Sequence, residues 1–296
     1  MRPTWHVVAP ADIRWLLALT APRVHVASAY QYRILELDDA TFRRSEDAMA
    51  RALAGGRHLT RAEIGRVLGE AGIPSGGLRL GYLVMHAELE AVICSGARRG
   101  RQQTYALLEE RVPPARQRSR DEALEELAFR FVAGHGPAQA GDLAWWSGLT
   151  LTDARRALDL AAPRFVRETH GERTFWASDS ADVSQSGAAP DSADASGPVV
   201  RLLPNYDELL IAFRDRSDAL DPSRPADARA SEALLAHIVV RDGLVVGGWR
   251  RRMAGASVRV ELRSLVPLDS AERAALAAEA ERLGRFLGRP VELGGA

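Results

Sequence analysis

The sequence contains no lysine, because all 39 of its basic residues are arginine. Schiff-base chemistry needs a lysine amine, so that class of covalent catalysis is excluded. A phosphate-binding loop of the Gly-rich type with its lysine is also absent. A GC-rich coding sequence explains the use of arginine. Arginine nevertheless gives each basic patch a planar fork that suits phosphate groups.

Cysteine and long apolar runs are scarce as well. Cys94 is the only cysteine, so no internal disulfide can form, which fits a reducing compartment. No apolar run approaches the roughly 20 residues that span a bilayer, and no signal peptide pattern opens the chain. The seven histidines are scattered, without His-x-x-x-His spacing. We therefore expect a cytoplasmic protein with no membrane partner, no metal site and no cofactor.

The length of 296 residues, with 46% hydrophobic content, predicts two or three domains. The opening segment, residues 1–36, begins with a predicted strand over residues 2–8. A helix should follow from Pro10 to about Leu19. A strand at the start of a chain needs a neighbour, so we expect either a later sheet to pair with it or a missing upstream segment.

Residues 37–112 predict a winged helix-turn-helix. A helix from Asp38 to about Leu53 precedes a helix that Thr60 and Glu63 begin as a capping box, and a third runs over residues 77–91. A β-hairpin with a basic turn follows at residues 92–108. The same order recurs over residues 113–177, where Thr150 or Thr152 caps the third helix.

The C-terminal part predicts a different architecture. Residues 178–198 are rich in Ser, Ala, Gly and Asp and should form a flexible linker. Residues 199–296 hold alternating strands, a hairpin through Asp242 and Gly243, and a helix that begins near Asp269. The predicted fold class is α+β, with tandem winged helix-turn-helix modules and a C-terminal β-rich α/β unit.

Basic side chains at the hairpin turns and on the third helix of the first module are candidates for contact with duplex DNA. The alternatives are a solvated loop for the turns and ordinary packing for the helix. The candidates are Arg79, Tyr82 and His86 on the helix, Arg98, Arg99 and Arg101 in the first turn, Arg167 and Arg173 in the second hairpin, and Arg250, Arg251 and Arg252 in a C-terminal strand. Trp145 and Trp146 are expected in the core.

Three carboxylates follow the strand that begins at Val200, in the run Leu203-Pro204-Asn205-Tyr206-Asp207-Glu208 and at Asp215. A carboxylate beside an oxocarbenium-like transition state stabilises it and orients water, so Asp207 and Glu208 are catalytic candidates. The alternative interpretation is structural: Asp207 caps a helix, and Asp215 pairs with Arg214 or Arg216.

Several of these motifs, in this order, resemble the AlkZ/YcaQ-like winged-helix family along nearly the whole chain. The matching stretches are Thr4-Trp5-His6-Val7-Val8, Leu78-Arg79-Leu80-Gly81-Tyr82-Leu83, Cys94-Ser95-Gly96, Trp145-Trp146-Ser147-Gly148-Leu149, Leu203 to Glu208, and Asp215-Arg216-Ser217. The resemblance implies a curved scaffold around duplex DNA. It also implies a monofunctional DNA glycosylase that removes N7-alkylated purines and unhooks interstrand crosslinks.

One departure from the family concerns catalysis. Its glycosylases carry a Gln-x-Gln or Gln-x-Asp motif upstream of the Thr-x-His strand, on a segment that this sequence lacks. Tyr30-Gln31-Tyr32 does not substitute for it, so no catalytic residue is carried over from that motif. His6 matches the Thr-x-His strand and is a third catalytic candidate, with a buried structural role as the alternative.

The sequence thus predicts a monomeric protein that binds double-stranded DNA, alkylated or crosslinked, in the nucleoid. Glycosylase activity is one hypothesis. The alternative is a non-enzymatic winged-helix transcriptional regulator, although regulators of this type usually dimerise on paired half-sites.

Overall fold

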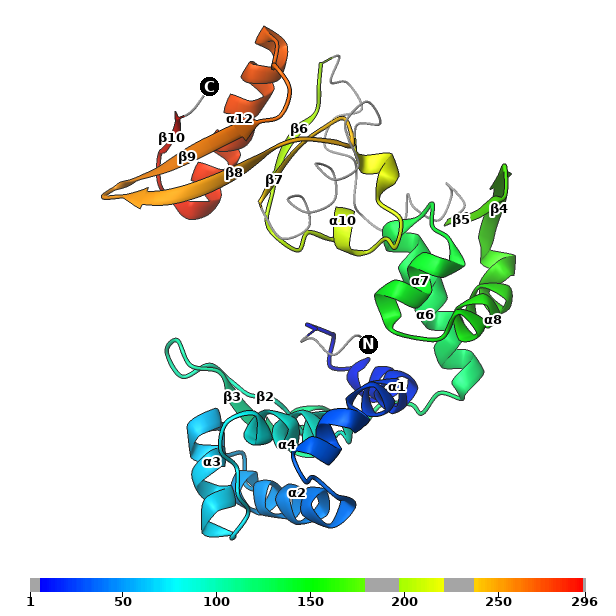
Figure 1. Ribbon diagram of the computed structural model, residues 1–296, viewed down its shortest axis with the longest axis vertical. Helices are drawn as coiled ribbons and strands as arrows, with labels where there is room; N and C mark the ends of the chain where they lie inside the picture. The colour runs from blue at the N-terminus through cyan, green and yellow to red at the C-terminus, as the bar shows by residue number, and fades with distance from the viewer. Residues whose placement is uncertain (1–5, 179–196, 221–236, 295–296) are drawn as a thin grey trace. The chain divides into compact units, whose positions relative to one another are not determined.

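A computed structural model describes residues 6–178, 197–220 and 237–294 (Figure 1). The chain divides into two compact units. Unit 1 comprises residues 1–131 and 147–164, and unit 2 comprises residues 132–146 and 165–296. Helices dominate unit 1 and strands dominate the C-terminal part of unit 2, so the α+β class is confirmed. The five segment boundaries given above stay predictions.

Unit 1 is built from helices around a small sheet. Its helices are α1 (Ile13–Ile34), α2 (Asp39–Leu53), α3 (Arg61–Glu70), α4 (Leu78–Leu89), α5 (Leu108–Arg111), most of α6 (Arg120–His135) and α8 (Leu151–Ala161). Its antiparallel sheet has the order β1 (Leu59–Thr60), β3 (Thr104–Leu107), β2 (Ile93–Ser95). The side chains of Met49, Leu53, Ile64, Leu68 and Leu83 are fully buried between α2, α3 and α4.

Local signals placed these helices correctly. The Asp38 carboxylate accepts a hydrogen bond from the backbone N–H of Thr41 and begins α2. Thr60 and Glu63 form the predicted capping box of α3. Thr150, and not Thr152, caps α8 by accepting a hydrogen bond from the N–H of Asp153.

The N-terminal prediction was wrong in two respects. Residues 1–5 lie outside the described part of the chain, but residues 6–8, predicted as the end of a strand, have no regular structure. The helix predicted to end near Leu19 continues to Ile34 and includes Pro22. Proline costs a helix one backbone hydrogen bond. Burial of Trp15, Leu19 and Val24 along α1 offsets that cost.

In its described residues, unit 2 contains a hairpin, a five-stranded sheet, the C-terminal end of α6 and further helices of different lengths. Its elements are α7 (Ala140–Ser147), β4 (Phe165–His170), β5 (Arg173–Ser178), β6 (Val200–Leu203), α10 (Glu208–Ile211), β7 (Ile238–Arg241), β8 (Leu244–Ala254), β9 (Ser257–Ser264), α12 (Ser270–Leu287) and β10 (Val291–Gly294). The predicted turn at Asp242 and Gly243 joins β7 to β8, and Asp269 caps α12, as expected.

The sheet order is β10-β9-β8-β7-β6, with β10 parallel to β9 and the other pairs antiparallel. Helix α12 covers one face, where Val239 of β7 joins a cluster with Leu276 and Ala280 of α12 (Figure 1). Ile238 and Val240, the neighbours of Val239, point to the opposite face and pack with Leu210 of α10. Because β7 is covered on both faces, it fixes α10 to the sheet.

The predicted linker and the polar loop that follows α10 fall largely on residues 179–196 and 221–236, outside the described residues. Among the residues that the structure describes, no helix has the length and apolar character that a transmembrane span requires.

The capping box of α3 gives a prediction about acid stability. The N–H of Thr60, at 2.7 Å, and the guanidinium of Arg99, at 2.8 Å, bind the carboxylate of Glu63, and they lower its pKa from 4.5 to about 2. A lowered pKa in the folded state stabilises the protein above pH 4.5, and this stabilisation is lost as pH falls towards 2. Glu63→Gln should therefore lower the thermal midpoint most at pH 7, and the difference from wild type should shrink towards pH 3.

Glu70→Gln, at the other end of α3, is the matched control and should change the midpoint little. An effect of Glu63→Gln that is equally large at pH 7 and pH 3 would contradict the assigned interactions. Thermal unfolding followed by circular dichroism measures both variants.

Candidate functional site: arginine surfaces and the Glu208 cluster

The turn between β2 and β3 presents arginines of two kinds. Arg99 is held at the base of the hairpin, where it donates to Glu63 Oε1 at 2.8 Å and to the carbonyl of His58 at 2.7 Å. Arg98 and Arg101 are exposed and make no ion pair with any described residue. Arg99 therefore positions the turn, and its two neighbours are available to an anion.

The three candidates on α4 are engaged within unit 1. Arg79 donates to the carbonyls of Leu35 and Pro74. Tyr82 packs on the core, edge-on to Tyr32. His86 lies 2.7 Å from Glu46 Oε1 and stacks on Phe42. These contacts agree with the packing alternative, and DNA contact by the three residues stays a prediction.

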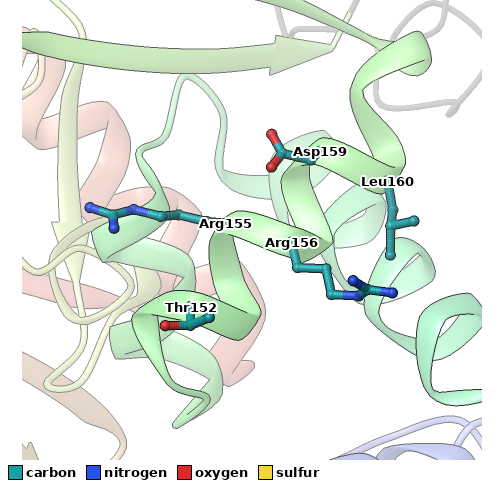
Figure 2. A pocket seen from close by; sticks show the side chains of 5 residues that line it. All are labelled: Thr152, Arg155, Arg156, Asp159 and Leu160. Atoms are coloured by element: carbon teal, nitrogen blue, oxygen red, sulfur yellow. The ribbon is translucent and has the colours of Figure 1, made fainter.

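Helix α8 presents a basic face that was not predicted from the sequence. Ala154, Ala157 and Leu158 are buried, and the opposite face borders a hollow of about 490 Å³ (Figure 2). The hollow is lined by Thr152, Arg155, Arg156, Asp159 and Leu160. Arg156 makes a bidentate pair with Asp121, at 2.9 and 2.6 Å. Arg155 is exposed and has no ion-pair partner in the described ranges.

The hairpin of β4 and β5 carries arginines that other side chains partly engage. Arg167 lies over the ring of Trp176, at 5.7 Å from its centroid. Arg173 approaches Asp218 at 3.4 Å and Asp215 at 3.6 Å. Asp215 therefore pairs with Arg173 and not with Arg214 or Arg216, so the predicted partner was wrong. The fold brings β5 and the segment after α10 together, which sequence distance conceals.

The basic run at the end of β8 alternates in its contacts. Arg250 and Arg252 both approach Glu261 of β9, at 2.6 and 3.7 Å. Arg251 points away from this pair of contacts, is exposed, and has no ion pair within the described residues. Of the three, Arg251 is thus the guanidinium left for an external anion.

The two carboxylates predicted as catalytic candidates, Asp207 and Glu208, have different environments. Asp207 caps α10, since its Oδ1 accepts the N–H of Leu209 at 3.0 Å, which confirms the structural interpretation for this residue. Glu208 is half exposed and points its Oε2 at Trp146 Nε1, at 3.1 Å, and at His135 Nε2, at 3.4 Å. The rings of His135 and Trp146 lie 5.5 Å apart. Glu208, His135 and Trp146 are called the Glu208 cluster below.

A buried aspartate fixes the segment that carries this cluster. Asp142 of α7 is 4% exposed, and its carboxylate accepts the N–H of Arg214 and the N–H of Gln139, both at 2.9 Å. Trp145 of α7 donates its indole N–H to the carbonyl of Ile211 at 2.9 Å. These bonds attach α7 to the C-terminal end of α10 and to the residues that follow it, so they fix the segment that carries Glu208.

The histidine and tryptophan predictions were partly wrong. His6 is exposed on a segment without regular structure, so it is not the buried histidine that was expected. Trp145 was expected in the core but is 43% exposed, and Arg216 lies over its ring at 5.4 Å. Its indole is anchored by one edge to Ile211, which leaves part of the ring in solvent.

A family profile described as "DNA glycosylase AlkZ-like" matches residues 1–286, nearly the whole chain. The chain belongs to the AlkZ-like family. The resemblance seen in the sequence is therefore confirmed. No curated protein matches this AlkZ-like chain significantly.

Among solved structures, the chain is similar to the DNA glycosylase AlkZ of Streptomyces sahachiroi. The TM-score is 0.73 at 20% sequence identity, over 99% of this chain and 80% of that one. At this identity the likeness shows a shared fold. It supports the AlkZ-like architecture of the helices and sheet described above.

Sequence reasoning missed several residues of these surfaces: His135, Asp142, Arg155 and Arg216. The sequence offered one usable signal, because Arg155 follows the capped start of α8. Nothing local connects His135 or Asp142 with residues some 70 positions later, so only the folded chain reveals them.

The anchoring role of Asp142 is testable by mutation. Asp142→Ala leaves two N–H groups without their acceptor, each of which costs about 1–3 kcal/mol when buried. We expect a loss of about 2–4 kcal/mol in the free energy of unfolding from chemical denaturation. Asp142→Asn retains one acceptor oxygen and should lose about half as much. Equal stability of Asp142→Ala and wild type would contradict the anchor.

Proposed function

We propose that this AlkZ-like protein binds duplex DNA through two winged-helix modules and a C-terminal β unit, and that it hydrolyses the N-glycosidic bond of alkylated purines. In each proposed module three helices precede a hairpin: α2, α3 and α4 before β2 and β3, and α6, α7 and α8 before β4 and β5. That order is the one in which a recognition helix is followed by a wing.

Zero net charge is compatible with DNA binding because only some of the arginines are paired with carboxylates. Several arginines near the proposed surfaces are paired with a carboxylate, as Arg99 is with Glu63 and Arg250 with Glu261. Arg98, Arg101 and Arg155 are exposed on a turn and a helix face. Phosphate contacts depend on such local groups, and the overall sum of charge matters less.

The enzymatic part of the proposal is supported chiefly by the free side of the Glu208 carboxylate. The contacts with Trp146 and His135 are both made by Oε2 of Glu208, and Oε1 has no partner among the described residues. One oxygen is held by Trp146 and His135, and the other is free to orient a water molecule. This is the arrangement that hydrolysis through an oxocarbenium-like state requires of a carboxylate.

The leaving group in this reaction needs little assistance. Alkylation at N7 gives the purine a positive charge, which weakens its bond to the sugar, so no general acid has to protonate it. The developing charge then lies on the sugar, where a carboxylate stabilises it. The partly exposed ring of Trp145, anchored at Ile211, offers a surface on which a displaced base could stack.

The phosphate-binding role of the first wing predicts a specific salt dependence. Each phosphate contact contributes a slope of about −0.9 in log K against log salt concentration. Arg98→Ala with Arg101→Ala should therefore reduce the steepness of the slope by about 2, as measured by fluorescence anisotropy on duplex DNA. Arg43→Ala with Arg51→Ala, which removes the same charge from exposed positions of α2, is the control.

Wild-type affinity that does not fall with salt would overturn the binding proposal. An equal change in both double variants would contradict the assignment to the wing, since it would mean that only total charge matters.

Catalysis by Glu208 is tested with duplex DNA that contains 7-methylguanine. Glu208→Gln keeps the size of the side chain but loses the charge, so base release should fall at least about 100-fold while duplex affinity is retained. Asp207→Asn is the matched control, because asparagine caps helices as well as aspartate does and release should persist.

Base release that is unchanged in Glu208→Gln would remove Glu208 from the mechanism. Absence of release by wild type, together with selective binding to a palindromic site, would favour the transcriptional regulator over the enzyme.

A further inference from the structure

Two histidines and a glutamate, from α1 and from the C-terminal end of α4, converge in unit 1. His25 lies on α1, His86 on α4, and Glu90 directly follows α4. One ligand-type atom from each of the three lies within 4.8 Å of the others. The ring centroids of the two histidines are 4.7 Å apart. This group is called the His25 cluster.

Each imidazole of the cluster is oriented from behind through its Nδ1. Nδ1 of His25 lies 2.9 Å from the hydroxyl of Tyr32, and Nδ1 of His86 lies 2.7 Å from Oε1 of Glu46. Proteins orient metal-binding histidines in this way, since a partner on one ring nitrogen fixes the tautomer and leaves the other nitrogen for the ion. In both rings the remaining nitrogen is Nε2.

The Nε2 of His25 supplies a second, independent observation. It is buried and makes no hydrogen bond within the described residues. Oε1 of Glu90 is only 3.0 Å away, so the distance is short but the alignment that an N–H donor needs is missing. A buried nitrogen without a hydrogen bond is costly, unless its lone pair is used by something else.

We propose that His25, His86 and Glu90 form a binding site for one Zn²⁺ ion. Two imidazoles and one carboxylate are a known ligand set of zinc, with bonds of about 2.0–2.2 Å. Tetrahedral coordination at these lengths places the ligand atoms roughly 3.5 Å apart, so the cluster has to contract by about 1 Å. Oε1 of Glu90 is already 3.0 Å from Nε2 of His25, so the contraction has to bring His86 closer to these two residues.

The fourth position of the proposed site opens to solvent on the side of Glu90, so water completes the coordination. The ion would connect the C-terminal end of α4 to the middle of α1, and through Glu46 it would also involve α2. Helices α2 and α4 contribute to the core of unit 1, and Tyr32 of α1 packs against it. Bound Zn²⁺ should therefore stabilise unit 1 and is not part of the proposed glycosidic chemistry.

A competing explanation is a purely polar network, in which His25 and His86 only pair with the glutamates. Metal titration of the purified full-length chain separates the two explanations. We expect one Zn²⁺ per chain in a chelator competition assay, and Co²⁺ in the same site should give the visible absorption bands of a four- or five-coordinate ion. Zn²⁺ should also raise the thermal midpoint of the wild type.

His25→Gln and His86→Gln each remove a proposed ligand and should weaken Zn²⁺ binding by more than about 100-fold, because loss of an orienting partner alone costs about 10–100-fold. Glu46→Gln removes such a partner and should fall within that smaller range. His170→Gln is the control, since His170 also lies beside a carboxylate, Glu168 at 3.2 Å, but on an exposed strand. Circular dichroism verifies that each variant is folded.

Binding of Zn²⁺ by wild type that is no tighter than binding by the folded His25→Gln variant would overturn the proposal in favour of the polar network. The same conclusion follows if Co²⁺ gives only the weak spectrum of the hexaaquo ion. His86 stacks on Phe42, so its replacement can disturb packing. The His25→Gln and Glu46→Gln variants then decide the question without it.

Discussion

Burial of β7 on both faces is the constraint on which the C-terminal part of unit 2 depends. Val239 faces α12, whereas Ile238 and Val240 face α10, so the strand is apolar at successive positions. A strand with two covered faces loses the alternation of a half-exposed strand. Because the second face of β7 packs against α10, this helix of only four residues has a fixed place on the sheet. Glu208 is the first residue of α10, so the position of Glu208 follows from the packing of Leu210, two residues later.

In unit 1 the corresponding role belongs to carboxylates that organise arginines. Glu63 completes the capping box of α3 and at the same time binds Arg99, so a single side chain links the start of a helix to the turn of the hairpin. Arg99 in turn donates to the carbonyl of His58. A chain with equal numbers of acidic and basic residues can thus use many of its arginines in internal ion pairs and hydrogen bonds. Arg98 and Arg101 make no such pair among the described residues, and they protrude from the turn that Arg99 holds in place.

The parts of the fold that the sequence predicted correctly depend on neighbours within a few residues. Caps at Asp38, Thr60 and Asp269 and the turn at Asp242 and Gly243 are local interactions, and each was found where the sequence placed it.

The failures are long-range in every case. Helix α1 continues through Pro22 because distant side chains bury Trp15 and Val24. Asp215 pairs with Arg173, 42 positions earlier, and Trp145 is anchored to Ile211 with one part of its ring in solvent. The same limit applies to the candidate sites, since the partners of Glu208 and of His25 come from other helices.

The contrast between Asp207 and Glu208 illustrates how neighbouring carboxylates acquire different roles. The sequence presents them as an equivalent pair, and either side chain can cap a helix or take part in hydrolysis. In the fold, Asp207 directs Oδ1 to the backbone of Leu209, which is the duty of a cap. Glu208, one position later, is rotated towards α7, where Trp146 and His135 bind the same oxygen. The cap uses Oδ1 of Asp207 to hold the helix start. In Glu208, two donors on Oε2 fix the orientation of the carboxylate and leave Oε1 accessible. Of the two carboxylates, Glu208 is therefore the one whose geometry suits the proposed hydrolysis.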